Sequence, residues 1–209
     1  MAFIFDSEFI TISILVLKKI TGKLQFDIHL KRAENKYTKL FKVGDIVSQS
    51  RLERYWMNKN ISELSVSKDE YRQYLLYVEQ VADKYVEDTS SIEANEVVHI
   101  TREIIDLTML EIFVDMNVDQ SALIHASQAV KGCVDVLARD PGSIVKIFKH
   151  ITKHPYLLKH SIATAMFSLM LAKIEKNESE HTYQKLGLGA LMHDIGMSRL
   201  SFDPEDKDS

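Results

Sequence analysis

The stretch YLLKHSIATAMFSLMLAKIEK, residues 156–176, has apolar residues at the spacing of a buried helix. Leu158, Ile162, Met166 and Leu169 are three or four residues apart, so a helix would place them on one face. Pro155 precedes the stretch and is typical of a helix start, because proline is tolerated at the beginning of a helix but breaks the interior of one. We therefore predict a core helix here.

A second predicted helix follows in YQKLGLGALMHD, residues 183–194, and carries His193 and Asp194 at its end. His160 lies near the border of the first helix's apolar face. Neighbouring residues of a helix diverge by about 100°, so His193 and Asp194 do not point the same way, but both can reach ions in one cleft if a carboxylate oxygen bridges the ions. Imidazole nitrogen and carboxylate oxygen suit Mn, Fe, Ni or Zn better than Ca. Two such ions can bind the attacking water and the leaving oxygen of a phosphodiester.

Composition favours a mostly helical protein that is kept in a reducing compartment. The chain has 209 residues, of which 45% are hydrophobic, with only three prolines and seven glycines. The single cysteine, Cys133, cannot form an internal disulfide. A net charge of −4 argues against a protein dedicated to coating nucleic acid. We expect a cytoplasmic location.

The longest apolar run, FITISILVL from Phe9 to Leu17, is about half as long as a membrane-spanning helix. It follows Asp6 and Glu8, where a secretory signal would carry positive charge. We interpret the run as core and expect no association with a membrane.

The pattern of apolar and polar residues in the first third of the chain is typical of a small α+β domain. Residues 24–31 and 36–42 alternate with a period near two, which predicts two strands joined by a turn at residues 32–35. Gly44 and Asp45 end the second strand, and Ser48 or Ser50 can cap a short helix. Residues 63–68 predict a third strand, followed by a helix.

Beyond this domain the pattern is helical, with helices predicted at residues 95–116, 120–138 and 142–149. We predict an α+β regulatory or accessory domain at 1–88, connecting helices at 89–140, and the start of a helical domain at 141–209. The apolar positions from Ile105 to Val114 exceed one helix face, so this helix is buried on two sides or pairs with a second copy.

The motifs LLKHSIATAMFSLMLAK (157–173) and LGLGALMHDIG (186–196) resemble the opening of the HD superfamily of metal-dependent phosphohydrolases. Within it they resemble the HD-GYP branch, which hydrolyses cyclic di-GMP. Residues 26–45 and 50–71 are similar to a small domain found ahead of such units. The resemblance implies a mostly α protein in which a small N-terminal α+β domain precedes an all-helical HD-type domain that this chain contains only in part.

The resemblance also implies roles for individual residues. His160 corresponds to a ligand of one metal ion, His193 to a ligand of the same ion or its neighbour, and Asp194 to the bridging, catalytic carboxylate. The implied cofactor is a pair of divalent ions, Fe or Mn, and the implied substrate is cyclic di-GMP.

Three departures from the family pattern accompany these matches. Met197 stands where the branch has a lysine that helps to hold substrate phosphate, with Arg199 two residues further on. Tyr156 stands where some members have a glutamate that supplies a third metal, which favours a two-metal centre. The family's remaining ligands and its GYP signature would lie beyond Ser209, so we expect the 209 residues alone to be inactive.

Several alternatives remain open from the sequence. His150 and His154 have the i, i+4 spacing of a zinc clamp, but no HExxH glutamate follows His150, and surface histidines are the simpler interpretation. The basic hairpin at residues 31–42 can meet phosphate or be merely solvated. For function, the alternatives are an inactive HD-like signalling module that binds protein partners, with a homodimer through residues 89–140, and an HD hydrolase of another nucleotide.

Overall fold

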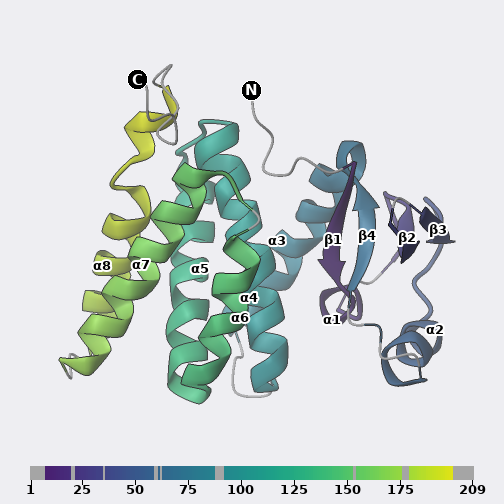
Figure 1. The fold of residues 1–209 in the computed structure, drawn as a ribbon, viewed down its shortest axis with the longest axis horizontal. Coiled ribbons are helices and arrows are strands. Elements are labelled where there is room, and N and C mark those ends of the chain that lie inside the picture. The colour runs from purple at the N-terminus through teal and green to yellow at the C-terminus, as the bar shows by residue number, and fades with distance from the viewer. Residues whose placement is uncertain are drawn as a thin grey trace. The chain divides into compact units, whose positions relative to one another are not determined.

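The computed structural model describes residues 8–19, 22–34, 36–58, 61, 63–87, 92–152, 154–175 and 179–199. The chain forms two compact units, one spanning residues 6–92 and the other beginning at Glu93. The predicted fold class is confirmed, since an α+β unit is followed by a helical one (Figure 1). The further division at residue 140 stays a prediction.

The first unit contains an antiparallel sheet of four strands in the order β1-β4-β2-β3. The strands are β1 (Phe9–Ser13), β2 (Ile28–Ala33), β3 (Lys36–Phe41) and β4 (Glu63–Ser67). The predicted hairpin is present, because β2 pairs with β3 up to Ala33 opposite Lys36. The strand predicted from residue 24 begins only at Ile28.

The four residues before β2 follow a different path from the one predicted. The Leu24 amide donates to the Asp45 carbonyl, and the Gly44 amide donates to the Leu24 carbonyl, both at 2.8 Å. Gly44 adopts a positive φ of 88°, which a glycine tolerates without strain. Leu24 and Phe26 are fully buried, so tertiary burial and this loop pairing take the place of a strand ladder.

The run from Phe9 to Leu17 is core, as predicted, but it divides between β1 and the short helix α1 (Ile14–Leu17). The Ser13 hydroxyl accepts the Leu15 amide and turns the strand into the helix. Helix α2 (Gln49–Glu53) begins after Ser48, one of the two predicted caps. A π-helical turn over Arg54–Asn58 continues α2.

Helix α3 (Tyr71–Glu87) completes the first unit and contacts β4. Tyr74, on α3, is fully buried and meets the ring of Phe26 edge-on, with ring centroids 5.6 Å apart. The Tyr77 hydroxyl donates to the Lys23 carbonyl at 2.6 Å, which ties α3 to the segment before β2.

The described residues of the second unit form five α-helices: α4 (Ala94–Met109), α5 (Gln120–Arg139), α6 (Ile144–Ile151), α7 (Tyr156–Ile174) and α8 (Glu180–Met192). All five lie within or close to the helices predicted from periodicity. Helix α5 packs against α4, α7 and α8, while α7 packs against α8 (Figure 1). A π-helical turn at Leu110–Val114 follows α4, and a 3-10 turn at Ile195–Arg199 follows α8.

Among the described residues, α7 is the helix with the length and apolar composition that a membrane span requires. One face of α7 is nevertheless core, because Leu158, Ile162, Met166 and Leu169 are buried as predicted. Another part of the helix exposes Phe167, Leu171 and Ile174, so packing within this unit accounts for only part of its apolar composition.

Candidate metal centre

His160, His193 and Asp194 come together where the beginning of α7 meets the end of α8. His160 is the fifth residue of α7, whereas His193 follows the last residue of α8 and Asp194 comes next. Packing of α7 against α8 brings the three side chains together although 33 residues separate the two histidines.

The three candidate ligand atoms form a nearly regular triangle. His193 Nε2 lies 3.1 Å from Asp194 Oδ2, His160 Nε2 lies 3.4 Å from the same oxygen, and the two Nε2 atoms are 3.3 Å apart. Ligands with bonds of about 2.0–2.2 Å to one tetrahedral ion are separated by roughly 3.3 Å. The residues present therefore fit a divalent transition metal.

The tautomer of His193 supports the same interpretation. Its Nδ1 donates to the Ala190 carbonyl at 2.8 Å, and since a carbonyl only accepts, Nδ1 carries the proton. A neutral His193 then presents a lone pair at Nε2, which faces the Asp194 carboxylate 3.1 Å away. Two acceptors at this distance repel each other unless a cation or a proton lies between them.

The surroundings also favour a cation. The three side chains are part-exposed, so an ion and its water ligands can reach them. His193 and Asp194 stand at the C-terminal end of α8, where the helix dipole is negative. Tyr156 stacks on His160 with ring planes 5° apart and centroids at 5.9 Å, so an aromatic ring orients this imidazole.

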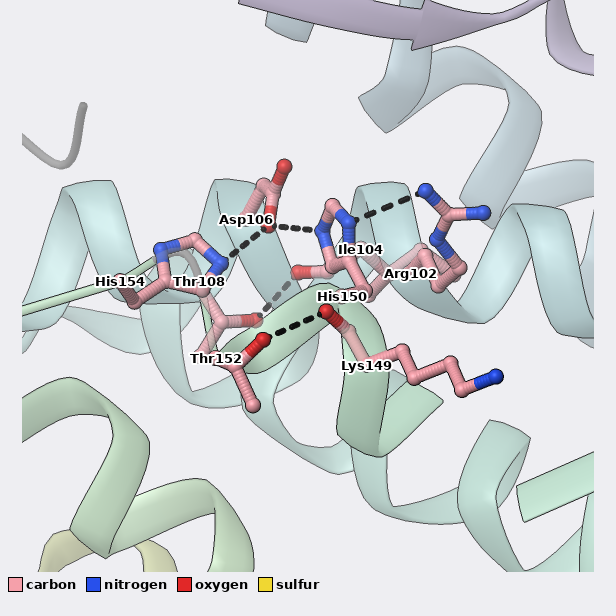
Figure 2. Close-up of polar contacts among 8 residues, drawn as sticks. All are labelled: Arg102, Ile104, Asp106, Thr108, Lys149, His150, Thr152 and His154. Atoms are coloured by element: carbon pink, nitrogen blue, oxygen red, sulfur yellow. Dashed lines mark hydrogen bonds and ion pairs between the residues drawn. The ribbon is translucent and has the colours of Figure 1, made fainter. Parts of the chain in front are cut away.

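A second cluster of the same residue types lies inside the helical unit (Figure 2). Asp106, on α4, accepts a hydrogen bond through Oδ1 from His150 Nε2 at 2.7 Å, and His154 Nε2 lies 3.0 Å from the same oxygen. Asp106 and His154 are fully buried, and His150 almost so. The interpretation of His150 and His154 as surface histidines is wrong, because the packing of α6 on α4 covers them.

Arg102 decides how the protons of this second cluster are arranged. Its Nη2 lies 3.1 Å from His150 Nδ1, and because a guanidinium only donates, Nδ1 is the acceptor. His150 then carries its proton on Nε2 and donates it to Asp106. Ligation through Nε2 would need the opposite tautomer, so His150 belongs to a hydrogen-bonded network, whereas His193 of the exposed cluster has the tautomer of a metal ligand.

Burial by itself would raise the pKa of Asp106, but electrostatic attraction to the imidazoles of His150 and His154 and the hydrogen bonding of the cluster hold it below its ordinary value. The carboxylate is therefore ionised inside the fold. A buried carboxylate is tolerated when hydrogen bonds and nearby charge compensate its desolvation, and the network supplies both.

Sequence reasoning missed Asp106. The i, i+4 spacing of His150 and His154 marked the two imidazoles, but Asp106 lies 44 residues before His150 and follows no local signal. Its position among apolar residues of α4 was the available hint, because an aspartate that is fully buried needs a partner.

Met197, the residue at the position of the branch's lysine, can also be placed. Met197 lies in the 3-10 turn after α8, part-buried, and its thioether offers no charge to a phosphate. The side chain of Arg199 lies outside the described residues.

Burial raises the pKa of the Cys133 thiol to about 12, so this cysteine is no candidate ligand.

Comparisons with known proteins add one structural likeness. The chain is similar to Bd1817, an HDG"Y"P protein from Bdellovibrio bacteriovorus, with 17% sequence identity and a TM-score of 0.44. The match covers 93% of this chain and spans 62% of the other. No family model matches the chain, and no curated protein matches it.

Proposed function

We propose that the protein is a metal-dependent phosphohydrolase of the HD-GYP type that acts on cyclic di-GMP. The observation that carries the proposal is the triangle of His160 Nε2, His193 Nε2 and Asp194 Oδ2, with sides of 3.1–3.4 Å. The tautomer of His193, fixed by the Ala190 carbonyl, supports it.

In this proposal His160 and His193 hold divalent ions, Fe or Mn, and Asp194 bridges two of them. Bound ions would activate water and stabilise charge on the phosphoryl oxygens. His193 is kept in the ligating tautomer by Ala190, and Tyr156 holds the imidazole of His160 by stacking. Because the three side chains are part-exposed, a phosphodiester can reach them from solvent.

Metal content tests the assignment. We expect His193→Ala to lose most bound Mn or Zn while the helices stay intact, because one corner of the triangle is removed. His181→Ala, an exposed histidine on the same helix, is the matched control and should keep the metal. Elemental analysis of both variants, with circular dichroism for folding, checks the result. Equal metal in His193→Ala and the wild type would refute the site.

Met197 favours two other candidate functions. One is an HD hydrolase of another nucleotide, and the other is an HD-like signalling module without activity. The position after HDIG lacks the positive charge that would hold a phosphate of cyclic di-GMP. Binding and turnover of cyclic di-GMP separate the candidates: binding without a linear product favours the signalling module, and turnover of other nucleotides favours the broader hydrolase.

We further propose that the protein acts in the cytoplasm, as a homodimer through residues 89–140 and with signalling proteins as partners. Nearly all residues of α4 from Val97 onward are already buried within one chain, so the apolar surface available to a dimer in this range is that of Val118, Leu123 and Ile124, which are exposed. Size-exclusion chromatography with light scattering tests this, and a strict monomer at high concentration would remove the dimer.

A further inference from the structure

The connection between α6 and α7 is fastened to α4 on both of its sides. His150 lies in the last turn of α6 and His154 immediately precedes Pro155, yet the Nε2 atoms of both lie within 3.0 Å of one oxygen of Asp106 (Figure 2). Within the connection, the His154 amide donates to the Ile151 carbonyl at 3.0 Å. The place where α7 starts is therefore fixed by a single buried carboxylate.

That starting point controls the position of His160. His160 lies six residues after His154, and the part of this segment that is helical, from Tyr156 to His160, is about 6 Å long. Pro155 limits the backbone between them, and Tyr156, the first residue of α7, stacks on the imidazole of His160. A displacement at His154 would thus be passed to the His160 ring through the backbone and through this stack.

The geometry of the candidate metal triangle is sensitive to such a displacement, because its three corner atoms belong to residues positioned by two different helices. His160 belongs to α7, whereas His193 and Asp194 follow α8. A shift of α7 along α8 changes the 3.3 Å and 3.4 Å separations of His160 Nε2 from its two partners but leaves the 3.1 Å separation within His193-Asp194 unchanged.

We propose that Asp106, His150 and His154 are positioning residues, which hold α7 so that His160 meets His193 and Asp194. This inference rests on the proposed metal site. Arg102 is a further positioning residue of this group, because its hydrogen bond to Nδ1 keeps His150 as a donor toward Asp106.

Glutamine at position 150 separates a positioning role from metal binding. A neutral His150 accepts at Nδ1 and donates at Nε2, and a glutamine amide accepts and donates across a similar span. His150→Gln can therefore restore the bridge from Arg102 to Asp106, but it is a poor replacement for an imidazole ligand. His150→Leu removes the bridge while it keeps the buried volume similar.

The experiment measures the affinity of the full 209-residue chain for Zn²⁺ alone, by competition with a chromogenic chelator. Three protein ligands with water are a normal zinc set. We expect His150→Leu to bind Zn²⁺ about three- to tenfold more weakly, somewhat less than the loss usual for partners in direct contact with ligands. His150→Gln should stay within about twofold of the wild type, and His181→Leu, on an exposed position of α8, should bind as the wild type does.

Each other outcome has a definite meaning. Unchanged affinity in His150→Leu overturns the positioning role and leaves the metal site standing, and so does a glutamine variant as weak as the leucine variant. Zinc that survives His193→Ala but is lost in His150→Leu would place the metal at the buried cluster and overturn both proposals. A wild-type chain that binds no Zn²⁺ removes the proposed function, and the positioning role with it.

A variant at the edge of the network covers the case in which His150→Leu does not fold, as judged by circular dichroism. Arg102→Met removes the donor to His150 from a partly exposed position, so it leaves the core in place. We expect it to weaken Zn²⁺ binding by about two- to threefold. Unchanged Zn²⁺ affinity in a folded Arg102→Met chain would then count against the inference.

Discussion

Histidine and aspartate perform two different tasks in this protein, and the hydrogen bond at Nδ1 decides which. The Nδ1 of His193 donates to the Ala190 carbonyl, which leaves Nε2 as a lone pair that a cation can use. The Nδ1 of His150 accepts from Arg102, which leaves Nε2 as a donor that a carboxylate can use. Residue type alone therefore does not distinguish a metal centre from a structural network.

The lowered pKa of Asp106 makes a prediction about stability and pH. A carboxyl group with a folded pKa below its ordinary value of about 3.9 stabilises the fold above that pH, and this stabilisation is lost as pH falls toward the folded pKa. An asparagine side chain cannot titrate, so Asp106→Asn should be less stable than the wild type by about 3 kcal/mol or more near pH 7. The difference in free energy of unfolding between the wild type and Asp106→Asn should become smaller as pH falls from about 5 to about 2.

Urea unfolding followed by circular dichroism at several pH values checks this difference. Asp119→Asn, at an exposed helix cap of the same unit, is a control that should show a much smaller gap at neutral pH. A gap for Asp106→Asn that stays constant from neutral to acid pH would show that the ionised carboxylate is not the source of stability.

At the scale of elements, two glycines allow helices to approach α5 closely. A Cβ added to Gly132, on α5, would lie 2.4 Å from Thr101 Oγ1 of α4. A Cβ added to Gly187, on α8, would lie 2.5 Å from Val130 Cγ1 of α5. Helix α8 carries His193 and Asp194 at its end, so the contact at Gly187 helps to set where the candidate ligands stand.

Alanine substitutions at two positions of α8 should have opposite effects. Gly187→Ala overpacks the contact with the stiff Val130 side chain and should lower the free energy of unfolding by about 1–3 kcal/mol. Gly189→Ala meets nothing within 4 Å and should raise it by about 0.5–1 kcal/mol, because alanine favours the helix. Denaturant unfolding measures both values.

A double variant locates the cause at this contact. Gly187→Ala combined with Val130→Ala should cost less than the sum of the two single changes, because the shortened side chain makes room for the new methyl group. Strict additivity, or a Gly187→Ala chain as stable as Gly189→Ala, would mean that α8 and α5 are not held at this contact.

At the scale of the whole molecule, the number of ligands limits what residues 1–209 can do. The described residues of the exposed cluster supply three side chains, while two divalent ions together need about ten to twelve coordination positions. We expect residues 1–209 to hydrolyse cyclic di-GMP no faster than their His193→Ala variant. A polypeptide that continues with further histidine and aspartate ligands should produce linear dinucleotide or GMP, more slowly than an enzyme with lysine at position 197.

Chromatography of the product, with Mn or Fe(II) added, compares the two polypeptides. Robust turnover by residues 1–209 would overturn the expectation based on ligand number. In the longer polypeptide, Met197→Lys tests the phosphate contact, and it should lower KM for cyclic di-GMP because a positive charge is added. An unchanged KM would show that position 197 does not meet the substrate.

The sequence by itself determined the helical class, most element positions and the pairing of His160 with His193-Asp194. Periodicity decides the first two features, since a residue's neighbours at i+3 and i+4 set which face of a helix is apolar. The pairing of the three candidate ligands follows from the resemblance of residues 157–173 and 186–196 to HD motifs. Local pattern was insufficient where a segment is shaped by distant contacts. Leu24 and Phe26 alternate like a strand, but their burial and the backbone bonds to Gly44 and Asp45 make them a loop.

Only the tertiary structure decided the chemistry of the two His–Asp clusters. Asp106 contacts His150 and His154 because α6 packs on α4. Asp106 and His150 are 44 residues apart in the sequence, so no local pattern indicates this contact. The tautomers of His150 and His193 likewise follow from contacts with Arg102 and Ala190. Proton positions depend on which donor or acceptor lies opposite each ring nitrogen, and folding alone brings those partners together.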